Sequence, residues 1–219
     1  MIEVTVARPW IDVRFAALQH VLSWTLNRPG LVRSDRLLWR EVRDADLHAD
    51  FDVAAWLEAE LAAREAREVP CFLTSRDVRR VVRRDVRVEG QEVTCLATVG
   101  LSNAERIGTR LPAAAAVAGT INVLVATGTG LTEAARLEAL AMAAQARTVA
   151  VLEAGIVLPT GLATGTGTDC IAVVAPEGGT AFAGLHTALG EAIGGAVLGA
   201  VREGIETWQA ETAAAEGTA

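Results

Sequence analysis

The fold of this chain is decided by residues 89–100, which read EGQEVTCLATVG. Glu89-Gly90-Gln91 has the composition of a tight hairpin connection, because glycine readily adopts the positive φ that such a turn requires. From Val93 to Val99 every second residue is apolar, which indicates a strand with one face fully buried. A strand that follows a hairpin pairs antiparallel with the strand before it. The stretch therefore favours a sheet built from hairpins over a doubly wound parallel sheet.

Further strands are predicted on both sides of this hairpin. Residues 1–42 contain short apolar pieces that are broken by prolines and charged pairs, a pattern typical of strands and turns. Residues 70–74 indicate a short buried strand, and residues 75–88 a brief helical turn followed by a strand. Beyond the hairpin, residues 119–127 and 170–175 predict two more buried strands.

Three helices are predicted. Asp52 is the expected N-cap of the first, which carries apolar residues at helical spacing to about residue 67. Thr132 caps a long second helix that ends at Gly155, and Thr187 starts a third that runs to about Trp208. Residues 209–219 are mostly Ala, Glu and Thr without periodicity, so we expect a disordered tail. The predicted fold class is α+β: a single domain over residues 1–208, with a mixed or largely antiparallel sheet and helices packed on it.

The composition restricts the chemistry. The 219 residues carry a net charge of −7 and are 51% hydrophobic. This suits one domain with a sizeable core and opposes attraction to nucleic acid or to an anionic membrane surface. The chain has no lysine, which excludes a Schiff base, a lysine nucleophile and a phosphate-loop lysine. Acid–base catalysis therefore depends on His, Asp, Glu, Cys or bound water. The arginines between positions 76 and 87 are expected to form a solvated face.

The cysteines indicate neither disulfides nor a metal site. Cys71, Cys95 and Cys170 are odd in number and widely spaced among apolar residues, so we expect buried free thiols. The first residues lack the basic and then apolar pattern of a signal peptide, and the apolar run at 188–201 is too short to cross a membrane. We expect a cytoplasmic protein without membrane contacts, and a homo-oligomer stays open.

A second informative stretch reads TGTGTD, at residues 164–169, and enters the predicted strand at 170–175. Glycine removes the Cβ that would hold a ligand away, so such a loop can bring backbone N–H groups and hydroxyls close to a bound polar group. Its companions are TVGLSNA at 98–104, GTINV at 119–123 and GLHTALG at 184–190. In this order and at these separations, the four segments resemble the adenosylcobinamide amidohydrolase family. The similarity covers about residues 93–205.

The resemblance implies a reaction. Members of the family hydrolyse the amide that joins the corrinoid of adenosylcobinamide to aminopropanol, which gives adenosylcobyric acid for corrinoid salvage. The implied partner is a small-molecule corrinoid. The sequence has no cluster of metal ligands, so we expect neither a metal nor a cofactor. Two places differ from the family pattern. Gln145 and Arg147 stand where the family usually has Glu and Lys, and the N-terminal asparagine-diglycine pattern is reduced to Asn27-Arg28-Pro29-Gly30.

Three residues are candidates for the catalytic chemistry. His186 lies among small residues at a helix start, where the helix dipole favours a neutral imidazole, so it is predicted as the base and then the acid. Asp169 is predicted to orient it, although the carboxylate could instead bond the N–H groups of its own loop. Asn103 is predicted to anchor the carbonyl. Substrate contacts are predicted for Ser102, Asn122, Thr164, Thr166 and Thr168.

Each candidate also has a structural interpretation. An asparagine within a buried strand must find a partner, so Asn103 and Asn122 can equally bridge the core or cap a turn. The threonines can serve a tight turn alone. His20 and His48 are interpreted as structural residues.

Alternative mechanisms and functions remain open. In one mechanism a hydroxyl group is a covalent nucleophile, on Thr166, Thr168, Ser102 or Thr120. Within it, self-cleavage after Gly119 would make Thr120 a new N-terminus. The alternative function is a corrinoid-binding protein without hydrolase activity. Either function needs a wide cleft, which Trp10, Trp24 and Trp39 could line.

Overall fold

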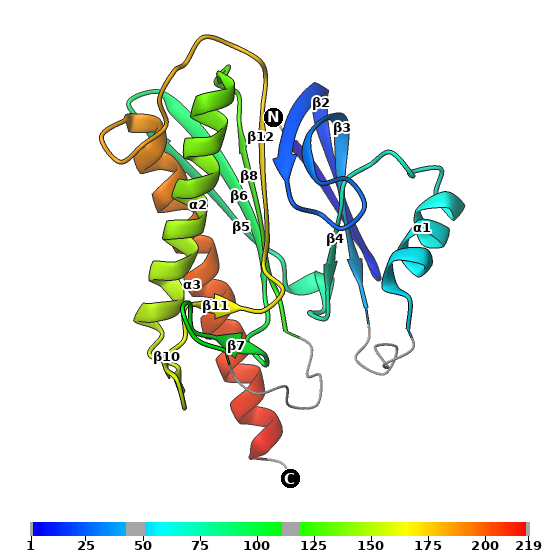
Figure 1. Ribbon diagram of the computed structural model, residues 1–219, viewed down its shortest axis with the longest axis vertical. Coiled ribbons are helices and arrows are strands. Elements are labelled where there is room, and N and C mark those ends of the chain that lie inside the picture. Colours follow the sequence, from blue (N-terminus) through cyan, green and yellow to red (C-terminus); the bar gives the residue numbers. More distant parts are fainter. Residues whose placement is uncertain (1, 43–50, 111–118, 218–219) are drawn as a thin grey trace.

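The structure is a computed structural model that describes residues 2–42, 51–110 and 119–217. His48 lies outside these residues. The described part forms a single α+β domain, as predicted, around an eight-stranded mixed sheet with the order β4-β3-β2-β12-β8-β6-β5, in which β1 pairs with β2. Figure 1 shows this sheet with α2 and α3 side by side on one part of it and α1 beyond its other end.

The N-terminal part supplies half of the sheet. Strand β2 (Trp10–Ser23) pairs antiparallel with both β1 (Ile2–Ala7) and β3 (Gly30–Glu41). Strand β4 (Cys71–Thr74) pairs with β3 in parallel. Between them, α1 (Val53–Ala63) begins at Asp52, which accepts hydrogen bonds from the backbone N–H groups of Ala54 and Ala55. The helix is shorter than predicted. It buries Leu57 and Leu61 against Trp10 and Leu38.

The predicted hairpin joins β5 (Val82–Val88) and β6 (Gln91–Val99), with Val88 opposite Gln91. Glu89 and Gly90 both have positive φ, as a two-residue hairpin turn requires. The predicted helical turn before it is present at Val78–Arg80. Ion pairs neutralise the arginines of this region. The pairs are Arg76 and Arg80 with Glu211, Arg79 with Asp77, Arg83 with Asp85, Arg84 with Glu203 and Arg87 with Glu92.

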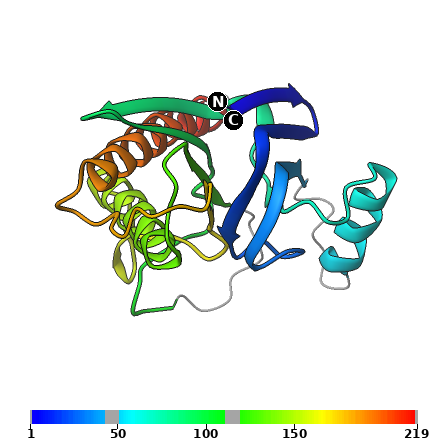
Figure 2. The ribbon, with the colours of Figure 1, turned by 90° about the horizontal axis from the view of Figure 1, so that it is seen from above.

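The other half of the sheet carries the helices. Strand β8 (Ile121–Thr127) is antiparallel to β6 and parallel to β12 (Cys170–Ala175), while β12 is antiparallel to β2. Helices α2 (Glu133–Glu153) and α3 (Ala188–Glu216) cover one face of these strands and bury the largest apolar cluster. Seen from above in Figure 2, both helices lie on the same side of the sheet. Short pairs complete the fold: β7 (Ala104–Glu105) with β11 (Gly165–Thr166), and β9 (Val157–Leu158) with β10 (Gly161–Leu162).

The disordered tail predicted at 209–219 is wrong for most of its length, because α3 continues to Glu216. Ala and Glu are strong helix formers, so this segment extends the helix without an apolar stripe of its own. Glu211 is also fixed by Arg76 and Arg80, at 2.6 and 2.7 Å. These partners are more than 130 residues away along the chain. Apolar periodicity alone therefore missed the extension.

No helix within the described ranges is long and apolar enough to cross a membrane.

Candidate functional site

The topology brings three of the four motif segments to one edge of the sheet. Strand β6 is antiparallel to β8, so the end of β6 lies beside the start of β8, with Val99 opposite Ile121. Strand β12 is parallel to β8, so Cys170 at its start lies beside Asn122. The loops at 100–103, 119–120 and 164–169 therefore meet at this edge.

Two threonines and one asparagine make a chain of hydrogen bonds there. The Thr168 hydroxyl donates to the carbonyl oxygen of Gly119 at 2.7 Å. Its oxygen lies 2.8 Å from Oγ1 of Thr120 and accepts from Nδ2 of Asn103 at 3.4 Å. Since the Thr168 proton is used on Gly119, the Thr120 hydroxyl is the donor to Thr168. We call Asn103, Gly119, Thr120 and Thr168 the hydroxyl cluster.

Close backbone packing fixes the cluster. A Cβ on Gly119 would lie 2.6 Å from Oδ1 of Asn103 and 2.8 Å from the backbone nitrogen of Ser102, so this position requires glycine. Within the described part of the chain, no donor reaches the buried Oδ1 of Asn103. A buried carbonyl without a donor costs about 1–3 kcal/mol, and this makes the atom a candidate for binding a donor group of a ligand.

The Asp169 carboxylate fixes the backbone segments next to the hydroxyl cluster. It accepts hydrogen bonds from the backbone N–H of Ile121 at 3.1 Å and of Thr166 at 3.0 Å, and from the Thr166 hydroxyl at 2.5 Å. It also forms an ion pair with Arg147 of α2, and the two side chains are 6% and 15% exposed. A Cβ on Gly165 would overlap the Arg147 guanidinium, which explains the glycine at this position of the motif. Asp169 is therefore a positioning residue that ties the loop, β8 and α2 together.

The structure does not bring His186 to this edge, so the predicted contact in which Asp169 orients His186 is not observed. His186 is exposed just before α3. Its loop is fixed to α2 by the backbone N–H of Ala183, which donates to Glu138 at 2.7 Å. Glu138 precedes Arg147 by nine residues, or about 13 Å along the helix. Figure 1 shows the start of α3 (orange) at the opposite end of the sheet from β7 and β11.

Local packing explains the GLHTALG segment that carries His186. Thr187 caps α3 by accepting from the backbone N–H of Gly190 at 2.9 Å, and its own hydroxyl donates to the carbonyl of Gly184. A Cβ on Gly190 would overlap that same carbonyl. The small residues and the helix start that make His186 a candidate in the sequence serve the helix cap in these contacts.

The other predicted substrate contacts fall into two groups. Ser102 is exposed beside the cluster, and Thr166 reaches the edge through Asp169. In contrast, Thr164 joins β11 to β7 by accepting from the backbone N–H of Ile107 at 2.8 Å. Asn122 is fully buried, and its Nδ2 donates to the carbonyl of Leu73 in β4 at 2.7 Å. In these contacts Thr164 and Asn122 follow their structural interpretation.

Trp24 is a neighbour of the site that motif reasoning named only as one of three candidate tryptophans. Its indole N–H donates to the backbone carbonyl of Asp169 at 2.7 Å, while the side chain stays 44% exposed. Asn27 fixes the same loop, because its amide donates to the carbonyl of Val69 and accepts from the N–H of Cys71. Leu26 and Leu31 are also exposed, at 51% and 44%. Trp10 and Trp39 are buried in the core instead.

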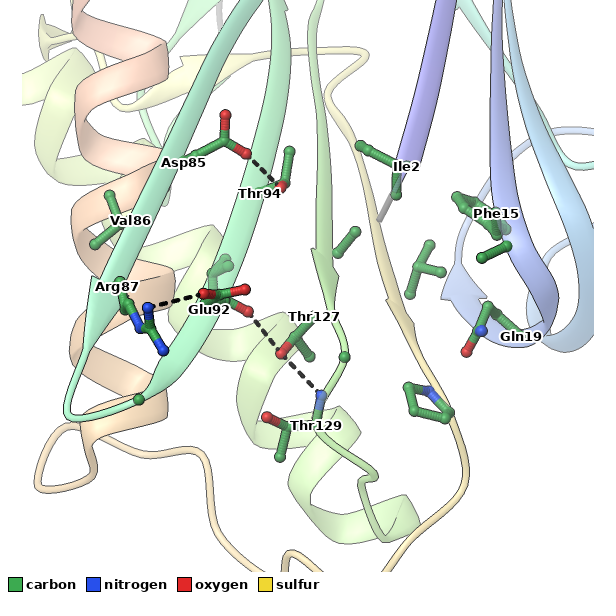
Figure 3. Close-up of a pocket in the computed structure, with 17 residues that line it drawn as sticks. Ile2, Phe15, Gln19, Asp85, Val86, Arg87, Glu92, Thr94, Thr127 and Thr129 are labelled. Atoms are coloured by element: carbon green, nitrogen blue, oxygen red, sulfur yellow. Dashed lines mark hydrogen bonds and ion pairs between the residues drawn. The ribbon is translucent and has the colours of Figure 1, made fainter.

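A cavity of about 720 Å³ lies elsewhere, where β8 and β12 end (Figure 3). It is lined by residues such as Phe15, Thr127 and Val174. Figure 3 shows its charged side chains already engaged, with Arg87 paired to Glu92 and Asp85 bonded to Thr94. The motif segments do not line it.

Metal-ligating residues and thiols were the remaining candidates for chemistry within the described residues. In residues 2–42, 51–110 and 119–217, no group of three or more His, Cys, Asp or Glu side chains is placed to hold a metal ion. The three cysteines are free and buried, as predicted. Burial raises the pKa of the Cys170 thiol to about 12, so this thiol beside the site is a poor nucleophile at neutral pH.

One of the comparisons with known proteins agrees with the motif pattern. A search of the curated proteins finds no match to the chain. The family model for adenosylcobinamide amidohydrolase, CbiZ, matches residues 1–213, almost the whole chain and all of the edge described above. The chain therefore belongs to the adenosylcobinamide amidohydrolase family.

Proposed function

We propose that this protein hydrolyses the aminopropanol amide of adenosylcobinamide and releases adenosylcobyric acid for corrinoid salvage. The observation that carries the proposal is the meeting of three family motifs around the hydroxyl cluster. Amide hydrolysis needs hydrogen bonds to the carbonyl, a nucleophile and a proton for the departing amine. Hydroxyls and an asparagine amide can supply the hydrogen bonds and the nucleophile.

Each residue of the edge has a proposed role. The unpartnered Oδ1 of Asn103 accepts a hydrogen bond from the N–H of the substrate amide, and exposed Ser102 lies where the carbonyl enters. Thr168 links Asn103 to Thr120 through its hydroxyl. Asp169 and Arg147 hold the loop in place and do not touch the substrate.

The loop of Trp24 provides a surface for the macrocycle. A corrin ring presents a wide apolar face, and an exposed indole that is fixed by its own hydrogen bond can cover such a face at low entropic cost. Because Trp24 bonds the backbone of Asp169, the apolar surface and the hydroxyl cluster have a fixed spacing. The Asn27 amide holds the other side of this loop.

Product analysis tests the proposal. Purified protein is incubated with adenosylcobinamide, with and without a chelator, and aminopropanol and adenosylcobyric acid are quantified. We expect both products in equal amounts. The alternative, a corrinoid-binding protein without hydrolase activity, predicts a change in the corrinoid spectrum on mixing but no release of aminopropanol.

A matched pair of variants locates the activity. Thr168→Val removes one hydroxyl at nearly constant volume and should lower kcat/KM by about 100-fold, because Asn103 and Thr120 lose the hydrogen bonds that position them. Thr129→Val removes a hydroxyl that bonds Gln91 near the other end of β8 and should leave turnover within about twofold. Equal effects of the two variants would contradict the proposed site.

A further inference from the structure

The hydroxyl cluster surrounds a peptide bond of this chain. The carbonyl of Gly119 belongs to the Gly119–Thr120 bond and accepts a hydrogen bond from Thr168, while the hydroxyl of Thr120 donates to the same Thr168 oxygen. Thr168 thus connects the hydroxyl that follows this bond to the carbonyl oxygen within it. We propose that the chain cleaves itself between Gly119 and Thr120, and that the new α-amino group of Thr120 is the base of the hydrolase. The second half of this inference rests on the proposed function.

The need for a base motivates the inference. In the described part of the chain, the hydroxyls of Thr120 and Thr168 bond only each other, one carbonyl and one amide. The Asp169 carboxylate is already occupied, because it accepts three hydrogen bonds and pairs with Arg147. His186 lies at the far end of the sheet, and the Cys170 thiol is protonated at neutral pH. An N-terminal threonine carries its own base, because its α-amine titrates near pH 8.

The observed contacts suit the first step. Thr120 Oγ1 attacks the Gly119 carbonyl carbon while its proton passes to Thr168 Oγ1, and the Thr168 proton passes to the Gly119 oxygen. The result is a neutral five-membered ring intermediate. The C–N bond then breaks, the carbonyl re-forms, and the proton of the intermediate's hydroxyl passes to the nitrogen. These transfers leave an ester between Gly119 and the Thr120 oxygen, and a free amine on Thr120.

Water completes the cleavage. Its oxygen adds to the Gly119 carbon as the ester bond to Oγ1 breaks, and its proton restores the Thr120 hydroxyl. The products are a carboxyl on Gly119 and a free N-terminal Thr120, with no oxidant or metal consumed. Oδ1 of Asn103 lies beside Gly119, and its second lone pair can accept a hydrogen bond from the new amine when the first binds the substrate amide.

The environment of the bond agrees with this chemistry. Thr120 is 8% exposed, so the bond is hidden from a protease acting on the folded protein. Gly119 packs against the backbone nitrogens of Ser102 and Asn103, where an added Cβ would lie 2.8 and 2.9 Å from them. That packing keeps the Gly119 carbonyl oxygen within hydrogen-bond distance of the Thr168 hydroxyl. After cleavage, β8 stays paired on both sides with β6 and β12, so the two fragments remain together.

Mass spectrometry under denaturing conditions tests the inference directly. We expect two fragments, residues 1–119 and 120–219, whose masses add to that of the full chain plus one water. N-terminal sequencing of the second fragment should begin Thr-Ile-Asn-Val. A single chain of full mass overturns the inference whether or not the preparation has activity. Its failure is therefore distinct from failure of the proposed function, which product analysis decides.

Three variants separate self-cleavage from proteolysis. Thr120→Ala lacks the nucleophile and should stay intact, whereas Thr120→Ser keeps a hydroxyl and should be cleaved. Thr168→Val should slow cleavage at least tenfold, because it removes the proton connection. Circular dichroism confirms that each variant is folded, and Thr207→Ala on α3 serves as the cleaved control. Cleavage of folded Thr120→Ala, or a rate that rises with protein concentration, would assign the cut to another molecule and overturn the inference.

Discussion

Arg147 of α2 forms an ion pair with Asp169 at the start of β12, and the same carboxylate holds the backbone N–H groups of Ile121 and Thr166. One helix, one strand and one loop of the site thus share a single acceptor. Asp169 is 6% exposed, so removing its cation leaves a largely buried charge that keeps its hydrogen bonds but has lost its ion pair.

Arg147→Met should therefore lower the free energy of unfolding by about 3 kcal/mol. Arg147→Lys keeps the charge and should lower the free energy of unfolding by much less. Urea unfolding at pH 7 measures both. The matched control is Arg202→Met, because Arg202 pairs with Glu153 where both side chains are about half exposed, and such pairs contribute less than about 1 kcal/mol. A loss of similar size in both methionine variants would contradict the supporting role of Arg147.

Trp24→Ala should raise KM for adenosylcobinamide by about tenfold while kcat changes less. The substitution removes apolar contact area and leaves the hydroxyl cluster in place. Trp24→Phe keeps most of that area, so its KM should lie between that of the unmodified protein and that of Trp24→Ala. Phe182 is also exposed, but it lies in the segment that leads to α3, so Phe182→Ala is the control and should leave KM unchanged. A fall in kcat alone would show that Trp24 acts through Asp169.

His186→Ala distinguishes the structural arrangement from the sequence hypothesis. A proton carrier at this position would make turnover fall about 100-fold. Since His186 is exposed at the other end of the sheet, we expect turnover within about twofold of the unmodified protein. Steady-state release of aminopropanol measures it. A 100-fold loss of turnover with unchanged stability would show that His186 takes part in the reaction.

We expect the contribution of Asp77 to the stability of the protein to be lost in acid. Its hydrogen bonds with Arg79 lower the pKa of the carboxyl to about 2. Because the pKa of this carboxyl is lower in the folded state than in the unfolded state, its charged form stabilises the fold. The contribution is complete above the unfolded pKa of about 4 and disappears as the pH falls to about 2. Unfolding midpoints in urea at pH 7, 4 and 2.5 should show Asp77→Asn less stable than the unmodified protein at pH 7. The difference should be smallest at pH 2.5, and a constant difference would contradict the assignment.

Local signals in the sequence predicted much of the fold. The hairpin at Glu89 and Gly90, and the caps at Asp52, Thr132 and Thr187, all depend on residues within a few positions of one another. The segments that form the site were also found, because glycine beside hydroxyl residues marks close backbone approach wherever the loop lies. Their convergence was expected from family resemblance, and the structure brings three of the four to one edge of the sheet.

The sequence by itself thus determined the elements, their turns and caps, and the hydroxyl-rich loops. Only the tertiary structure decided which side chains meet. The parallel pairing of β12 with β8 brings Thr168 to Thr120, and the run of β12 away from that edge carries His186 to the other end. The ion-pair partners of Asp169 and Glu211 lie 22 residues or more away in sequence, so strand order and helix docking had to bring them together. Strand direction is a property of the whole sheet, and no single motif encodes it.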